Sequence, residues 1–294
     1  MLKSKKLYLL KNKTSAAGAK SCIKKIVCVS QSVRLYTAVC IIILCSSFGC
    51  ATKNEKKIND KAKFVTVEKD KKKDSAIQNI YITFDDGPLE GSNDIDDAVR
   101  NEQINVNVFV VGQHVLRDKE MRSFYKLYED NPYIEIGNHS FSHAHNRYKN
   151  YYAKPDAVVT DFLKCQETLN IKEKIARQPG RNQWRLPGVN INDVNSGATS
   201  ADLLYKAGYK VFGWDVEWQH DPKTDVPIQT VDDMVALIEK KLKEHKTVKP
   251  GNLILLAHDE MFRNGWEESE LKQLIDKLKA KGYYRFEHLS NYPG

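Results

Sequence analysis

An alternation that begins near residue 79 constrains the fold most strongly. Short apolar runs rich in β-branched residues predict strands, and the amphipathic stretches between them predict helices. The predicted strands cover residues 80–84, 106–111, 133–136, 175–177, 210–213, 253–257 and 283–286. The predicted helices cover residues 94–102, 118–129, 155–169, 201–207, 231–244 and 267–280. This order predicts an α/β fold, a distorted and incomplete (β/α) barrel whose parallel sheet is covered by helices.

Local signals mark the ends of several predicted helices. Pro155 suits a first helical turn, where its missing N–H leaves no bond unmade. Thr230, with Asp233 three residues later, is typical of a capping box at a helix start. Gly208 and Gly282 follow amphipathic segments, where a left-handed residue commonly ends a helix. These residues therefore favour helix boundaries close to the ranges given above.

The charge of the chain is concentrated at its beginning. Of 46 Lys and Arg and 38 Asp and Glu, residues 1–74 hold 18 and 5, which leaves 28 and 33 for residues 75–294. The net charge is therefore +13 for the first part and −5 for the second. Because a nucleic-acid-binding domain carries its basic residues on the folded part, we expect no nucleic-acid partner.

Residues 1–50 are predicted to be an export signal. Residues 1–34 contain nine Lys and Arg and no acid, and the apolar run 35–44 follows them. This order is typical of a secretory signal, and the run is short for a transmembrane helix. The pair Gly49-Cys50 resembles a lipoprotein cleavage site with Cys50 lipidated. We expect an exported protein held at the bacterial envelope membrane, with an uncleaved N-terminal anchor as the alternative.

Residues 51–76 are rich in Lys and poor in apolar side chains. Such a segment buries too little surface to offset the entropy of ordering it, so a flexible tether is predicted. Residues 77–294 are predicted to form a single domain. Because Cys165 is the only cysteine after Cys50, no disulfide stabilises this domain. We expect it to be a monomer.

Polar side chains follow the predicted strands, and barrel enzymes place their reactive residues where strands end. Asp85 and Asp86 follow the first strand and precede a Gly-Pro turn, while His139 and His143 follow the third. Two imidazoles with one carboxylate are typical of a Zn²⁺ site, or of another divalent transition metal. The sequence therefore predicts a metal site at the end of these strands.

Five motifs in order resemble the polysaccharide deacetylases, carbohydrate esterase family 4 with its NodB-homology domain: TFDDGP, HSFSH, R-x-P-G, W-D-x-E-W and LLAH. The resemblance runs from residue 80 to the C-terminus. It implies that Asp85 is the general base, that Asp86 binds the metal with His139 and His143, and that His258 is the general acid. The implied reaction removes acetyl groups, most often from N-acetylglucosamine units, from an envelope or extracellular polysaccharide.

Two assignments within this resemblance stay open. The family orients its base with an arginine, and Arg177 is preferred over Arg185 because it directly follows a predicted strand. The fourth family motif has two acids with two residues between them, and an acid there supports the catalytic histidine. Here Asp215 and Glu217 stand one residue closer together. Either of them is a candidate for that role.

The remaining expectations concern the substrate and the metal. A backbone N–H near Gly180 is a candidate second donor to the reaction oxyanion, and Arg185 is a candidate substrate contact. Trp214 and Trp218 offer flat apolar faces to sugar rings. Zn²⁺ is the expected metal, with Co²⁺ and Ni²⁺ as alternatives.

The same residues also suit two other functions. A polysaccharide-binding lipoprotein that has lost catalysis is the main alternative, because the third and fourth motifs depart from the family pattern. An iron oxygenase also uses two histidines and a carboxylate, but the alternation of strands and helices disfavours it.

Overall fold

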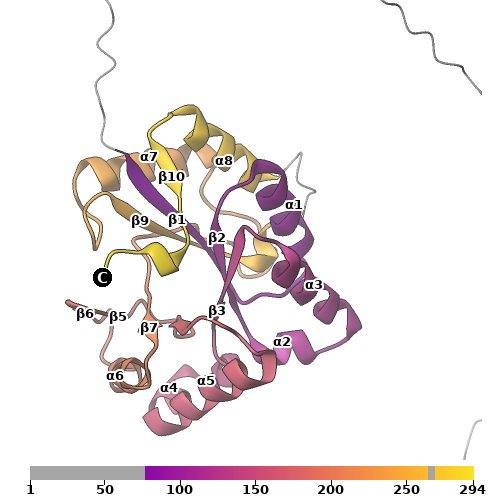
Figure 1. Ribbon diagram of the computed structural model, residues 1–294, viewed down its shortest axis with the longest axis vertical. Coiled ribbons are helices and arrows are strands. Elements are labelled where there is room, and N and C mark those ends of the chain that lie inside the picture. The colour runs from indigo at the N-terminus through magenta and orange to yellow at the C-terminus, as the bar shows by residue number, and fades with distance from the viewer. Residues whose placement is uncertain (1–76, 264–268) are drawn as a thin grey trace, which may run out of the picture. The chain divides into compact units, whose positions relative to one another are not determined.

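The computed structural model describes residues 77–263 and 269–294, with helices around a ten-stranded sheet (Figure 1). The strands are β1 (Gln78–Asp85), β2 (Val106–Val110), β3 (Ile134–Asn138), β4 (Ile175–Ala176), β5 (Trp184–Leu186), β6 (Val189–Ile191), β7 (Lys210–Val211), β8 (Val216–Glu217), β9 (Asn252–His258) and β10 (Tyr284–Phe286). The α-helices are α1 (Ser92–Glu102), α2 (Gly112–Leu116), α3 (Lys119–Asp130), α4 (Tyr148–Tyr152), α5 (Pro155–Leu169), α6 (Ala198–Lys206), α7 (Val231–Lys243) and α8 (Glu270–Ala280). The 3₁₀ helices are η1 (His143–Asn146), η2 (Asp259–Met261) and η3 (Leu289–Asn291).

The sheet is curled and open. Its strands run in the order β6-β5-β7-β4-β3-β2-β1-β9-β8, and β10 pairs with β1 beside this path. All pairings are parallel except those of β5 with β6 and with β7. Figure 1 shows the helices around the outside of the strands. The prediction of an incomplete (β/α) barrel is therefore confirmed.

Each predicted strand and helix has a counterpart in the structure. Pro155 occupies the start of α5, and Thr230 with Asp233 forms a reciprocal capping box at α7. Gly208 and Gly282 both have positive φ, at +90° and +74°. The structure adds β5, β6, β8, α2 and α4, which the sequence did not predict. These elements have two to five residues each, too few for a hydrophobic period to be read.

The core lies on both faces of the sheet, and β1 shows how. Ile80, Ile82 and Phe84 belong to the large apolar cluster beneath the helices, whereas Tyr81 belongs to a second cluster on the opposite face. Because both faces of a parallel sheet are covered, its strands are apolar throughout rather than alternating. The six residues 80–85 are accordingly all buried.

The central strand β1 has three partners. It pairs with β9 along residues 79–85, with β2 at residues 82–84 and with β10 at residues 78–80. The β9 register places Asp85 directly opposite His258. The first and the last of the five sequence motifs therefore meet at the carboxyl edge of the sheet.

The predicted export signal (1–50) and tether (51–76) lie outside the described residues. Within the described ranges, every helix is too short or too polar to cross a membrane.

Candidate active site

A cavity of about 290 Å³ lies at the carboxyl ends of β1, β3, β8 and β9. The residues that line it are Asp85, Asp86, His139, His143, Tyr148, Gly180, Asp193, Trp214, Glu217, Leu256 and His258. Parallel strands that end at one edge gather residues far apart in sequence into one mouth.

Three of these side chains converge as metal ligands would. Nε2 of His139 and Nε2 of His143 lie 3.3 and 2.9 Å from Oδ1 of Asp86. This oxygen is buried, and no donor among the described residues meets it with hydrogen-bond geometry. Burial raises the pKa of Asp86, but the two imidazoles outweigh it and hold the pKa well below its usual range. A carboxylate and two imidazole nitrogens facing one point fit a divalent transition metal.

The loop after β3 holds the two imidazoles. Nδ1 of His139 lies 2.8 Å from the carbonyl oxygen of Arg177, so this nitrogen carries the proton and Nε2 is free to bind. The backbone N–H of His143 donates to Ser140 Oγ at 3.0 Å. Ser140 and His143 both have positive φ, at 72° and 48°. The four-residue spacing is therefore accommodated by a tight loop rather than by one turn of α-helix.

His114, on α2, supports this site. Its Nδ1 lies 2.6 Å from the carbonyl oxygen of Asp86, and its ring centroid is 6.4 Å from that of His143. The nitrogen therefore donates to the backbone of the first motif and fixes the turn at Asp86. Nothing in the sequence around α2 indicates this contact.

Asp85 is paired with a buried arginine. Nη1 of Arg177 donates to Asp85 Oδ1 at 2.8 Å and to Thr83 Oγ1 at 2.7 Å. The same guanidinium donates to the carbonyl oxygens of Phe212 and Gly213, at 3.3 and 2.9 Å. Arg177 is fully buried and immobilised by these bonds. It therefore holds the Asp85 carboxylate in one orientation at the cavity wall.

His258 faces Asp85 from β9 and lines the cavity. Its Nδ1 is buried, and no hydrogen-bond partner for it occurs in residues 77–263 or 269–294. The ring packs edge-on against that of His220, with centroids 4.8 Å apart and planes at 80°. Among the described residues, no carboxylate bonds to this nitrogen to orient the ring.

The residue after His258 joins the first and last motifs. Asp259 is fully buried and accepts hydrogen bonds from Leu89 N at 3.0 Å, from Ser92 Oγ at 2.9 Å and from Tyr128 Oη. Burial raises the pKa of Asp259 to about 6. Sequence reasoning missed this residue, although its place after a strand-end histidine was a signal.

The two acids of the fourth motif lie apart. Glu217 lines the cavity. Asp215 lies outside it and accepts the backbone N–H groups of Val248 and Ile254, each at 2.8 Å. Burial raises the pKa of Asp215 to about 6. Asp215 therefore anchors the start of β9 rather than contacting the cavity.

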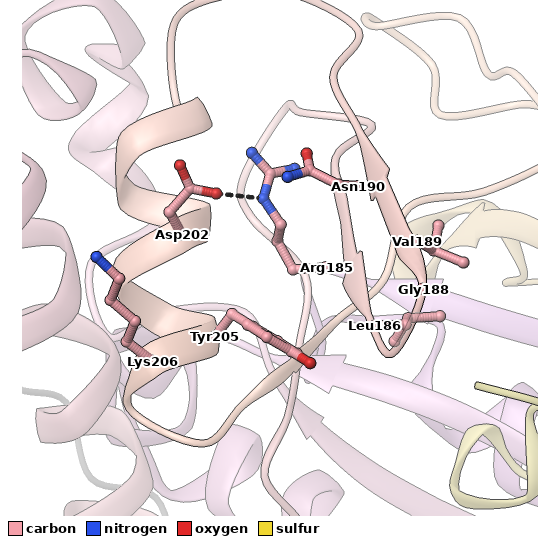
Figure 2. A pocket seen from close by; sticks show the side chains of 8 residues that line it. All are labelled: Arg185, Leu186, Gly188, Val189, Asn190, Asp202, Tyr205 and Lys206. Carbon is pink, nitrogen blue, oxygen red and sulfur yellow. Dashed lines mark hydrogen bonds and ion pairs between the residues drawn. The ribbon is translucent and has the colours of Figure 1, made fainter.

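Arg185 lies in another part of the domain. Figure 2 shows it in a separate pocket, facing Asp202, with which Nε forms an ion pair of 2.5 Å. Its Nη1 donates to the carbonyl oxygens of Trp184 and Ile191. None of the residues that line this pocket lines the cavity described above. Arg185 therefore holds the β5–β6 hairpin to α6, and Arg177 takes the position beside Asp85.

The tryptophans also differ. Trp214 and Gly180 line the cavity, as expected of substrate contacts. Trp218 is fully buried, with Nε1 bonded to the carbonyl oxygen of Gln229 and its ring 5.6 Å from that of Phe262. It therefore packs in the core and presents no face to a ligand. Tyr148 and Asp193 complete the wall, and no sequence signal pointed to Asp193.

With this geometry in place, comparison with known proteins assigns the family. The sequence model of the polysaccharide deacetylases matches residues 72–211. These residues belong to the polysaccharide deacetylase family. The resemblance found in the motifs is therefore confirmed. Deacetylases that release N-acetyl groups are hydrolases of carbon–nitrogen bonds other than peptide bonds.

Individual relatives of the deacetylase domain are distant. A chitin disaccharide deacetylase of Vibrio alginolyticus is 24% identical, with 47% of each chain covered, so the chain spans about half the length of this curated relative. A Streptococcus mutans CE4 esterase superposes with a TM-score of 0.54 at 20% identity, covering 71% of this chain and 85% of that one. The catalytic domain of a peptidoglycan N-acetylglucosamine deacetylase from Eubacterium rectale superposes with a TM-score of 0.53 at 20% sequence identity. The match covers 74% of this chain and 91% of that one. At such identities the structures establish a shared fold.

Proposed function

We propose that this protein is a metal-dependent hydrolase that removes acetyl groups from N-acetylglucosamine units of a cell-envelope or extracellular polysaccharide. One observation carries the proposal. Asp85 and His258 lie opposite each other on paired strands, at a cavity that also holds Asp86, His139 and His143. A base, an acid and a metal-ligand set at one cavity are what amide hydrolysis requires.

Asp86, His139 and His143 would hold the metal. Zn²⁺ is the first candidate, and Co²⁺ and Ni²⁺ are the alternatives, because two imidazoles and a carboxylate suit all three. When bound, such an ion would lower the pKa of water to about 7 and would polarise the acetyl carbonyl.

The chain's own residues supply the proton transfers. Asp85, held by Arg177, takes a proton from the attacking water as its oxygen bonds to the acetyl carbon. An unprotonated amine nitrogen would have to leave as an anion, which is a poor leaving group. His258 therefore donates a proton to the nitrogen as the carbon–nitrogen bond breaks, which leaves acetate and an amino sugar. A backbone N–H near Gly180 is the candidate donor to the oxyanion.

The cavity wall and the relatives both support the proposed substrate class. Tyr148 and Trp214 offer aromatic faces against which a sugar ring packs. The chitin disaccharide and peptidoglycan named for two of the relatives both contain N-acetylglucosamine. The acetylated sugar is therefore the shared feature on which the proposal rests, and the identity of the polymer is left to experiment.

The test measures acetate release from chitin oligomers and from peptidoglycan, with and without chelator. We expect turnover that chelation abolishes, that Zn²⁺, Co²⁺ or Ni²⁺ restores, and that Asp85→Asn lowers by about 100-fold or more. An exposed acid changed in the same way, Asp97→Asn, is the matched control. Failure to release acetate from any acetylated glycan, with metal bound, would overturn the proposal. Retained glycan binding in that case would favour the alternative, a polysaccharide-binding protein that has lost catalysis.

The place of action is a separate proposal. The basic leader and apolar run of residues 1–44, followed by Cys50, support export and attachment to the envelope membrane by a lipid or an N-terminal anchor. Metabolic labelling with a fatty acid tests the lipid, with Cys50→Ala as the comparison. Equal labelling of both proteins would exclude Cys50 as the attachment point.

A further inference from the structure

A second group of possible ligands lies beside His258. His220 and Asp225 belong to the loop between β8 and α7, and Glu260 belongs to η2, directly after β9. One side-chain ligand atom from each of the three lies within 4.8 Å of the others. None of the three lines the active-site cavity, so this group is distinct from the Asp86 ligand set.

Backbone hydrogen bonds hold two of these residues together. The N–H of Asp221 donates to the carbonyl oxygen of Val226 at 2.9 Å, and the N–H of Asp225 donates to Asp221 O at 2.8 Å. His220 and Pro227 face each other as an isolated bridge across the same turn. The turn therefore places Asp225 beside His220 without help from any ligand.

The group contains buried polar atoms that have no hydrogen-bond partner in the part of the chain that the structure describes. Oε2 of Glu260 and Nδ1 of His220 are buried and have no hydrogen-bond partner among the described residues. Nε2 of His220 and Oε1 of Glu260 are 4.0 Å apart, beyond hydrogen-bond distance. A buried carboxylate oxygen and a buried imidazole nitrogen without partners are costly.

The described residues compensate only part of the charge of the group. Arg263 contacts Asp225 through one oxygen, Oδ2, at 2.8 Å. No Lys or Arg of the described ranges pairs with Glu260. Burial, together with the nearby carboxylates of Asp86 and Asp259, raises the pKa of Glu260 to about 8. The raised pKa reflects how poorly the surroundings stabilise the charged form of this carboxylate, a form that a bound cation would stabilise.

We propose that His220, Asp225 and Glu260 bind a second divalent cation, of the class of Mn²⁺ or Zn²⁺. One imidazole and two carboxylates offer the mixed nitrogen and oxygen donors that such ions accept. The bound ion would fix the ring of His220, which packs on the ring of His258. The bound ion would thus help to orient His258, whose Nδ1 has no carboxylate partner among the residues that the structure describes. The inference stands independently of the proposed deacetylation.

The experiment counts bound Mn²⁺ on the full chain. Mn²⁺ is the probe because the five cysteines within residues 1–50 would bind Zn²⁺ but are poor ligands for Mn²⁺. Asp86→Ala with His139→Ala removes the first ligand set. In this background we expect calorimetric and electron paramagnetic resonance titrations to show one Mn²⁺ per chain.

Two further changes in the same background assign the site. Glu260→Gln and His220→Asn each remove a ligand, and we expect each to weaken Mn²⁺ binding by at least about tenfold. The matched controls are Glu173→Gln and His245→Asn, exposed residues whose replacement should leave binding unchanged. Circular dichroism checks folding, and either variant is sufficient if the other does not fold. Absence of Mn²⁺ binding in the background protein, or equal binding in the variants and controls, would overturn the proposal.

Discussion

At the scale of single residues, the site depends on one buried arginine. Arg177 bonds to Asp85, to Thr83 and to two backbone carbonyls, and none of its polar contacts is with solvent. Its carbonyl oxygen also accepts a hydrogen bond from Nδ1 of His139. One residue therefore contacts both the candidate base and the metal-ligand set. Loss of this side chain would leave a buried carboxylate without its counter-charge.

We therefore predict that Arg177→Met lowers the free energy of unfolding by about 3–5 kcal/mol, the usual cost of breaking a buried ion pair by removing one partner. Urea denaturation followed by tryptophan fluorescence measures the change. Arg122→Met, at an exposed site on α3, is the control and should stay within about 0.5 kcal/mol of the parent protein. A loss below about 1 kcal/mol for Arg177→Met would contradict this account.

Asp215 predicts a pH effect on stability. Burial raises its pKa to about 6 in the folded protein, above the value of about 3.9 for an unfolded chain. The folded state therefore binds this proton more tightly, and the free energy of unfolding falls as pH rises from about 4 to about 6. The fall due to Asp215 amounts to at most about 3 kcal/mol.

Asp215→Asn should remove this part of the pH dependence. Urea denaturation of the variant and the parent between pH 4 and pH 7 would show it, because the difference between their unfolding free energies should change across that window. The exposed Asp97→Asn should leave the pH profile unaltered. Parallel profiles for Asp215→Asn and the parent would disprove the assignment.

The positions of the site residues were predictable from sequence where a polar residue directly follows a predicted strand. Asp85, Asp86, His139 and His258 are of this kind, and each lines the cavity. The face to which each side chain of a short strand points was not predictable. Neighbouring residues of a strand point to opposite faces, so Trp218 turns away while Glu217 faces the cavity, and a two-residue strand gives no pattern from which to read this. Asp215 lies just before the strand and is held by the N–H groups of Val248 and Ile254, which the local sequence does not indicate.

At the scale of elements, the long helices follow their local signals. Oγ1 of Thr230 accepts the N–H of Asp233 at 3.2 Å, and Asp233 Oδ2 accepts the N–H of Thr230 at the same distance. These bonds satisfy two donors that a helix start otherwise leaves unpaired. The short elements β5 and β6 depend instead on tertiary contacts such as the Arg185–Asp202 ion pair. Local sequence therefore could not indicate them.

Thr230→Ala is accordingly predicted to lower the free energy of unfolding by about 1 kcal/mol, because the N-cap of α7 is lost. Thermal or urea unfolding detects a change of this size. Thr160→Ala is the matched control, since Thr160 is exposed within α5 and alanine is the better helix former. The control should be neutral or slightly stabilising, and a similar loss in both variants would argue against the capping box.

At the scale of the whole molecule, the described residues contain their own apolar core. The large cluster runs from Ile80 in β1 to Leu278 in α8, and a second cluster ends at Tyr292. Burial of apolar surface is the main source of folding free energy. We therefore expect residues 77–294 to fold as one unit.

A shortened chain that begins at residue 72 tests this. We expect its melting temperature to lie within about 2 °C of that of the full chain, measured by calorimetry at equal concentration. A decrease of more than about 5 °C would show that earlier residues contribute to the stability of the domain.

The pairing of β1 with both β9 and β10 has a consequence for biosynthesis. The strand at the middle of the sheet meets partners that are made much later, since Asn79 pairs with Asn252 and Gln78 pairs with Tyr284. Such distant partners cannot pair with it while the chain is still emerging from the ribosome, and closing so large a loop is slow. Asp85 and His258 therefore come together only after translation is nearly complete, so an unfinished chain has not yet assembled the candidate active site.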